Sequence, residues 1–143
     1  MSITRFLSVY AVTLPIFFAI DLVWLGVVAT SFYRQRLGHL LAAQVNWPAA
    51  ILFYLVFIAG VVFFAVKPAL EVKRAMRALV YGALFGFFTY ATYDLTNHAT
   101  MRDWPVIVTA VDLAWGTALS ASVAYLSYRL SSRIWQRPRR SQS

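Results

Sequence analysis

Four long apolar blocks, separated by short polar links, dominate the chain. None of them contains lysine or arginine, and each is close to the ~20 residues that a helix needs to cross the hydrocarbon core of a bilayer. A buried helix of a soluble protein is usually shorter and amphipathic. The pattern therefore predicts an all-α integral membrane protein with four transmembrane helices, over Phe6–Ala29, Pro48–Val66, Ala78–Asn97 and Pro105–Tyr128.

The links between the blocks predict how the helices connect. The link 98–104 is tight, so the third and fourth spans should form a hairpin, whereas the longer link 30–47 could hold a short interfacial helix. We expect one membrane domain, residues 1–128, followed by a basic cytoplasmic tail, residues 129–143. Gly82 and Gly86 form a Gly-xxx-Gly pair, which predicts close packing of the third span against another helix.

Composition supports a membrane protein and excludes several kinds of site. Of the 143 residues, 61% are hydrophobic and 13% are charged, against roughly 45–50% apolar and about 25% charged in a typical soluble domain. The chain has no cysteine, which excludes disulfides, thiolate metal sites and cysteine nucleophiles. We find no phosphate-binding loop, dinucleotide fingerprint or His-Glu-x-x-His motif.

Lysine and arginine are distributed unevenly between the two sides of the predicted bundle. Because these residues collect on the cytoplasmic side of membrane proteins, we expect both termini to lie in the cytoplasm. This asymmetry also accounts for the pI of about 10.3, so nucleic-acid binding is not expected. The cytoplasmic set is Arg5, Lys67, Lys73, Arg74, Arg77, Arg129, Arg133, Arg137, Arg139 and Arg140, and the outer set is Arg34, Arg36 and Arg102.

Three aspartates lie inside predicted spans, all in the outer half. Asp21 in "AIDLVW" and Asp112 in "AVDLAW" occupy near-identical hexapeptides. At about 1.5 Å of rise per residue, both lie roughly 10–12 Å below the outer surface, and Asp94 in "TYATYDLTN" lies about 5–9 Å from its end. A carboxylate at mid-helix costs about 2.5–3.5 kcal/mol on insertion scales, so each should face inward and have a partner.

The partners of these aspartates cannot be lysine or arginine of the spans, because the spans contain none. Protons, a metal or organic cation, neutral hydrogen-bond donors and arginines of the outer links are the alternatives. Two carboxyl groups sharing one pocket would favour binding of a proton between them. We therefore expect an acidic pocket that binds protons or a cationic ligand.

Helical spacing predicts which neighbours join the pocket. In the third span Tyr93 and Asn97 share a stripe with Gly86 and Tyr90, and Asp94 lies at the edge of that stripe. In the first and fourth spans a tryptophan follows each aspartate by one turn and could separate the site from lipid, although it could equally be an interface anchor. These tryptophans are Trp24 and Trp115.

Other interpretations of the polar residues stay open at this point. Asp94 and Asp112 flank the short hairpin link and could simply cap it near water. His98 follows Asp94 by four residues, a spacing suited to two metal ligands on one helix face, so a divalent metal held with Asp21 and Asp112 is a weak further hypothesis.

Several motifs along the chain resemble a family of small bacterial membrane proteins of unknown function. The resemblance covers nearly the whole chain to about Ser127, and it implies four spans and the bacterial inner membrane, but no activity. Asp21, Asp94, Asn97 and Asp112 match the family's motifs, whereas His98 departs from an apolar position. The motifs are "DLVWLG" at 21–26, "NWPAAILFYLVF" at 46–57, "KPAL" at 67–70, "GALFGFFTYATYDLTN" at 82–97, "WP" at 104–105 and "VDLAWGT" at 111–117.

Three functions are compatible with these features. The first is a binding or transport component that holds protons or a cationic small molecule and acts in the bilayer as a homo-oligomer or with a partner membrane protein. The second is an enzyme that acts on a lipid or isoprenoid, with an aspartate as general base or metal ligand. The third is an accessory or assembly subunit of another membrane protein. We favour the first.

Overall fold

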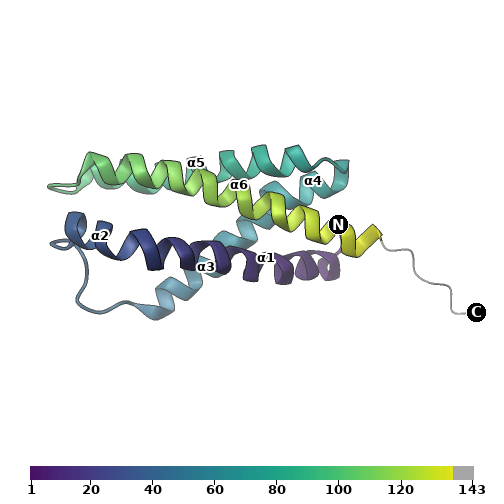
Figure 1. Ribbon diagram of the computed structural model, residues 1–143, viewed down its shortest axis with the longest axis horizontal. Helices are drawn as coiled ribbons and strands as arrows, with labels where there is room; N and C mark the ends of the chain where they lie inside the picture. The colour runs from purple at the N-terminus through teal and green to yellow at the C-terminus, as the bar shows by residue number, and fades with distance from the viewer. Residues whose placement is uncertain (137–143) are drawn as a thin grey trace, which may run out of the picture.

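Every regular element in residues 1–136, which the computed structural model describes, is a helix. The helices form four segments that run roughly along the long axis of the molecule and pack beside one another (Figure 1). The all-α fold expected from the sequence is therefore confirmed. In chain order the elements are α1 (Ile3–Trp24), η1 (Leu25–Ala29), α2 (Thr30–Leu37), α3 (Trp47–Val61), η2 (Val62–Val66), α4 (Lys67–Val72), α5 (Ala75–Thr100) and α6 (Val106–Gln136).

The first segment is longer than predicted. Residues 30–37, which we expected in a link with its own interfacial helix, instead continue the first helix as α2. A π-helical turn, η1, joins α1 to α2, and the hydroxyl of Thr30 donates to the carbonyl of Leu25 across this wider turn at 2.8 Å. The link does hold a short helix, as the sequence allowed, but this helix is not separate from the first span, because no proline or cap interrupts the chain before Gly38.

The second segment begins and ends with local signals that the sequence carries. The side chain of Asn46 accepts a hydrogen bond from the backbone N–H of Ala49 at 3.2 Å, and Pro48 occupies the first turn, where proline is well tolerated. The segment ends at Lys73, whose φ of 55° is left-handed. Helix α5 then returns in the opposite direction after a very short turn.

Helices α5 and α6 pack closely along their length, as the glycine pair predicted. A Cβ placed on Gly82 would lie 2.5 Å from the carbonyl oxygen of Ser120, and one on Gly86 would overlap the carbonyl oxygen of Gly116. Small residues at both positions let the two backbones approach to a distance that any side chain would prevent. This contact sets the distance between α5 and α6 for the residues that lie between it and the α5–α6 turn.

The fourth helix also extends past its predicted end. We expected the span to finish near Tyr128, but α6 continues to Gln136. The first residues of the predicted basic tail, 129–136, are therefore helical. The rest of that tail, 137–143, lies outside the described residues.

Three helical segments within residues 1–136 are long and apolar enough to cross a membrane, judged by length and composition: Ile3–Leu37, Trp47–Val72 and Val106–Trp135. Helix α5 has 26 residues but is less apolar, because hydroxyl groups, Asp94, Asn97 and His98 gather in its second half. The structure thus supports a membrane protein with three candidate spans, and the fourth span stays a prediction.

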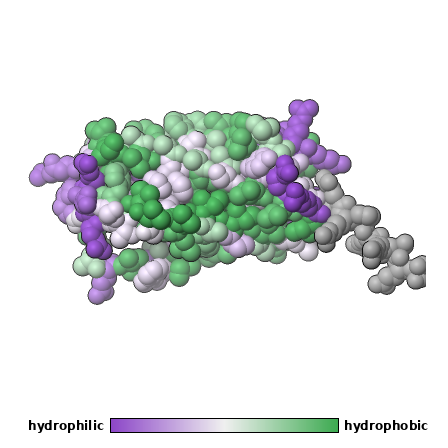
Figure 2. All heavy atoms as spheres, in the orientation of Figure 1, coloured by the Kyte–Doolittle hydropathy of each residue, from purple (hydrophilic) through white to green (hydrophobic). Residues whose placement is uncertain are grey.

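The surface shows the bilayer-facing character of the bundle directly. On the face shown in Figure 2, apolar side chains form a broad band across the middle, and hydrophilic side chains cluster at the two ends. Inside, fully buried residues such as Val9, Ile58 and Val123 make the main core between the segments. A smaller cluster of Leu37, Trp104 and Val108 ties α2 to the turn between α5 and α6.

Candidate functional site

The three aspartates singled out from the sequence are all buried in the structure. Asp94 has an exposed fraction of 0%, Asp21 of 6% and Asp112 of 7%. Asp94 and Asp112 lie within α5 and α6, not at their ends, and in the described chain no backbone N–H donates to either carboxyl. The geometry therefore does not support the alternative that the pair caps the hairpin at water.

Asp94 and Asp112 face each other across the α5–α6 contact. Their carboxyl groups lie within hydrogen-bonding reach of one another, whereas neither oxygen of Asp94 has a protein donor. The approach follows from the glycine contact, since Gly86 lies two turns before Asp94 and Gly116 one turn after Asp112. A direct hydrogen bond between two carboxyl groups would require a proton on one of them.

A tyrosine from the outer end of the first segment completes the environment of Asp112. The hydroxyl of Tyr33 in α2 donates to Oδ1 of Asp112, and the indole of Trp24 lies beside the same hydroxyl. We did not predict a role for Tyr33, because we placed it in an outer link. Continuation of the helix through residues 30–37 is what brings its side chain down into the site.

The carboxyl group of Asp21 has a different tyrosine partner. The hydroxyl of Tyr54 in α3 donates to Oδ2 of Asp21 at 3.3 Å. Sequence reasoning missed Tyr54 as well, although a signal existed: it is a phenol in the outer half of the second span, at a depth similar to that of Asp21. A search for neutral donors in every span, not only near the aspartates, would have found it.

Trp24 and Trp115, one turn beyond the two matched aspartates, meet face to face. Their ring centroids are 4.2 Å apart and the ring planes are nearly parallel, at 8°. The stack joins α1 to α6 beside Asp21 and Asp112. The stacked pair forms a wall of the site. The two rings pack against each other and are not separate interface anchors.

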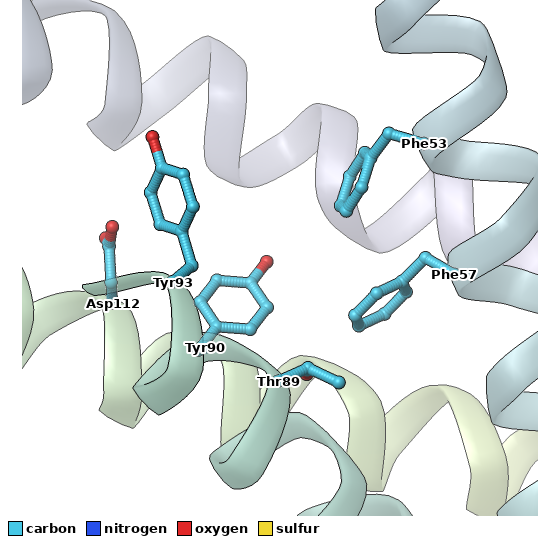
Figure 3. Close-up of a pocket in the computed structure, with 6 residues that line it drawn as sticks. All are labelled: Phe53, Phe57, Thr89, Tyr90, Tyr93 and Asp112. Carbon is cyan, nitrogen blue, oxygen red and sulfur yellow. The ribbon is translucent and has the colours of Figure 1, made fainter. Parts of the chain in front are cut away.

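Two neighbouring cavities open around these groups. The smaller, about 140 Å³, is bordered by Asp21, Tyr54, Trp24 and Trp115. The larger, about 350 Å³, is lined mainly by apolar and aromatic side chains together with Asp112. Figure 3 shows the larger one, with the rings of Phe53 and Phe57 from α3 facing Tyr90 and Thr89 of α5.

Tyr90 and Phe53 connect the two cavities, because both residues line each of them. The phenol of Tyr90 lies near the carboxyl groups of all three aspartates. We named Tyr90 only as a neighbour on the predicted stripe, yet it is the residue around which the aspartates are arranged. Its position is a tertiary feature, since it depends on α1, α5 and α6 together.

The predicted stripe of the third span was wrong in one respect. We placed Asp94 at its edge, but Asp94 is fully buried, while Tyr93 is 60% exposed. The close contact of Gly82 and Gly86 with α6 turns the Asp94 face inward. Tyr93 still lines the outer rim of the larger cavity, and its ring makes an edge contact with Trp104 at 6.1 Å.

Asn97 is half buried, one turn beyond Tyr93 and Asp94 toward the outer end of α5. Its Nδ2 has no hydrogen-bond acceptor, and it lines neither of the two cavities. The structure therefore places Asn97 near the site and not in its wall. A direct contact of Asn97 with a ligand stays a prediction.

The structure does not bring together the residues that we expected to bind a metal ion. His98 is exposed, while Asp94, its proposed partner, is buried. Within residues 1–136 no group of three or more histidines, aspartates and glutamates is close enough together to hold a metal ion. His98 therefore does not share the buried environment of the carboxyl groups that it was expected to join.

The carboxyl groups of the site also lack a basic partner. The single ion pair found among the described residues joins the amino terminus to Glu71 at 3.7 Å, at the other end of the bundle. Arg34, Arg36 and Arg102, which we predicted to be on the outer side, make no ion pair with a buried aspartate. The alternative that outer arginines reach in to neutralise the pocket is thus not what the structure contains.

The comparisons with known proteins give a family but no activity. Neither the curated proteins nor the solved structures contain a significant match to the chain. One family model, described as "Predicted membrane protein (DUF2177)", matches residues 6–129 and so includes all three aspartates and both stacked tryptophans. The chain therefore belongs to this family of predicted membrane proteins, whose function is unknown.

Proposed function

We propose that this protein binds a proton or a cationic small molecule in the outer half of the bundle and helps to move it within the membrane. The observation that carries the proposal is the convergence of three buried carboxyl groups that, within residues 1–136, have no lysine or arginine partner. Their neighbours are neutral phenols and indoles, which stabilise a carboxylate through hydrogen bonds without cancelling its charge.

Energetics favours a positive species as the missing partner. Removing a carboxylate from water costs several kcal/mol even after relaxation, and the phenols of Tyr33 and Tyr54 compensate only part of that cost. Three such groups around Tyr90 would repel one another if all were ionised and unoccupied. Binding of a proton or cation removes this repulsion, so the empty, fully ionised site is the least stable of its states.

Chemical modification tests this proposal. Dicyclohexylcarbodiimide is an apolar reagent that couples to protonated carboxyl groups inside membranes. We expect it to modify the peptides that carry Asp21, Asp94 and Asp112 in the purified protein, as measured by mass spectrometry. Modification should be lost when these three are changed together to asparagine.

Asp103→Asn is the matched control for this experiment. Asp103 is an exposed aspartate in the turn between α5 and α6, with a φ of 58°, a conformation that asparagine also adopts readily. The control should be modified as strongly as the unaltered protein. Equal modification of the triple variant, or an unmodified wild-type protein, would count decisively against a proton-binding pocket.

We also propose that α5 is the fourth span, with both termini in the cytoplasm of a bacterial inner membrane. In support, α5 has 26 residues and lies beside α6 within the apolar band. The amino terminus, the turn between α4 and α5 and the end of α6 lie at one end of the bundle (Figure 1). Most of the described lysines and arginines are at this end, as cytoplasmic ends require.

Single cysteines test the topology, because the chain has no cysteine of its own. We expect Gln44→Cys and Met101→Cys to react with a membrane-impermeant maleimide added to whole cells, and Val72→Cys to react only after the membrane is opened. A chain with three spans would leave positions 72 and 101 on the same side. That pattern of labelling would exclude α5 as a span.

The close packing in the inner half of the bundle supports a role for partner chains. Val61, Val62, Ala65 and Val66 are fully buried there, so the packed core separates the cavities from the cytoplasmic end. A ligand held in the outer half would need a second chain or another membrane protein to complete a path. The oligomeric state stays a prediction, which crosslinking in native membranes would check.

A further inference from the structure

The two cavities differ in what their walls can bind. The smaller one combines the carboxyl group of Asp21 with several aromatic rings, among them Tyr54, Trp24 and Trp115. The larger one extends from it along the rings of Phe53 and Phe57. A ligand with a charged end in the smaller cavity and an apolar remainder in the larger one would fill one connected space, because Phe53 and Tyr90 line both cavities.

The chemistry of the walls discriminates between kinds of cation. A metal ion that sheds its water needs about six to eight oxygen ligands around it, whereas the smaller cavity offers the oxygens of Asp21 and a few phenols. Aromatic faces attract organic ammonium ions, which are weakly hydrated and interact with the ring quadrupole. Rings surrounding a carboxylate therefore suit an ammonium ion far better than sodium or potassium.

The volumes limit the size of such a ligand. A cavity of about 150 Å³ in another protein holds benzene, so the smaller cavity, about 140 Å³, has room for a head of about four to six heavy atoms. A trimethylammonium or comparable head has that size. The larger cavity, about 350 Å³, lies within the usual range for small-molecule pockets, about 300–1,000 Å³.

The rim of the larger cavity indicates the direction of access. Phe53 is 49% exposed and Tyr93 is 60% exposed, and both lie in segments that form the apolar band of the bundle. In a bilayer these side chains face lipid. A ligand with an apolar substituent would dissolve in the bilayer first and then enter sideways between α3 and α5.

One buried carboxyl group close to the two cavities lacks a hydrogen-bond donor. Asp94 is fully buried, and both of its oxygens lack a donor, although it faces Asp112 on the wall of the larger cavity. An ammonium ion near Asp21 and Tyr90 would offset part of the negative charge shared by the three aspartates. Buried charge without such compensation is costly.

We propose that the ligand of this site is a lipophilic organic ammonium ion, with its charged head in the smaller cavity against Asp21 and its apolar substituent along Phe53 and Phe57. This inference rests on the proposed function and names the ligand class for it. The ammonium head belongs either to a free amine or to the headgroup of a lipid. The shared chemistry is a positively charged nitrogen carrying apolar groups.

A pair of compounds of equal shape tests the proposal. Benzyltrimethylammonium carries the charge, and neopentylbenzene replaces its nitrogen by carbon and is neutral. With the full-length protein in phosphatidylglycerol nanodiscs, we expect benzyltrimethylammonium to bind in calorimetric titration and to protect the three aspartates from dicyclohexylcarbodiimide. Neopentylbenzene should do neither. Equal protection by the two compounds would mean that the cavity is merely an apolar slot, and the proposal would be overturned.

Two variants of Tyr90 separate a ring effect from a folding effect. Tyr90→Phe keeps the aromatic face, so its affinity for benzyltrimethylammonium should stay close to that of the unaltered protein. Tyr90→Leu removes the face and should weaken binding roughly tenfold, since a desolvated cation–ring contact is worth about 1–2 kcal/mol. The same affinity in Tyr90→Leu and Tyr90→Phe would contradict recognition by the ring.

The outcomes distinguish this inference from the proposed function. If the aspartates react with the carbodiimide but benzyltrimethylammonium gives no protection, the ligand class is wrong and proton binding stands. If the aspartates do not react and the ammonium ion does not bind, both fail. Weaker binding of the ammonium ion in nanodiscs that contain phosphatidylethanolamine would identify a lipid headgroup as the competing ligand, and unchanged binding would identify a free amine.

Discussion

Replacing Gly86 with alanine should destabilise the protein by about 1–3 kcal/mol, the usual cost of overfilling a packed contact. The added Cβ would overlap the carbonyl oxygen of Gly116 and lie 2.6 Å from Oγ of Ser120. Because the first of these is a backbone atom, no side-chain rotation relieves the clash, and α5 and α6 must separate. Unfolding in detergent micelles, followed by circular dichroism, measures the change.

Gly26→Ala is the matched control, since a Cβ at Gly26 would have no atom within 4 Å. Alanine there should leave the protein equally stable or slightly more stable, because glycine inside a helix costs about 0.5–1 kcal/mol relative to alanine. Separation of α5 from α6 would also pull Asp94 away from Asp112. A Gly86→Ala protein as stable as Gly26→Ala would disprove the close contact on which the site depends.

Asp94→Asn should have the opposite effect on stability and remove the proton that Asp94 would share with Asp112. In the structure, neither oxygen of Asp94 has a donor, and leaving a buried polar group unsatisfied costs about 1–3 kcal/mol. The amide is neutral, has nearly the same shape and can donate to the carboxyl group of Asp112. We therefore expect the free energy of unfolding to rise by about that amount, measured as above.

The gain in stability and the loss of binding belong together. Functional groups are often retained at the expense of stability, and Asp94 is the fully buried member of the set. Asp103→Asn, which changes an exposed aspartate, should alter neither stability nor binding. If Asp94→Asn unfolds the protein, or binds protons as before, then Asp94 is a structural residue and our assignment is wrong.

The hydrophobic pattern was a good guide to the helices but a poor guide to where they end. A span was predicted to stop near Ala29, yet the helix continues to Leu37, and another was predicted to stop near Tyr128, yet it continues to Gln136. The hydrophobic pattern identifies the part of a helix that is surrounded by lipid or by the protein core. Helix formation itself extends into polar sequence until a proline, a glycine or a left-handed residue stops it.

Spacing along one helix identified the aspartates and tryptophans but not their phenol partners. Tyr33 and Tyr54 come from α2 and α3, far in sequence from Asp112 and Asp21. Helical periodicity says which residues share one face; it says nothing of which face of another helix lies opposite. For the same reason, periodicity did not predict that Asp94, which we had placed at the edge of its stripe, faces α6 and is buried.

The amino-acid sequence by itself determined that this is an all-helical membrane protein and that acidic groups lie in apolar segments without lysine or arginine, because both depend only on composition and on local order along the chain. The tertiary structure decided which groups meet. The contact of Gly86 with Gly116 brings Asp94 to Asp112, the stack of Trp24 on Trp115 joins two helices, and Tyr90 lies between two cavities. Those are distances between segments remote in sequence, and packing alone sets them.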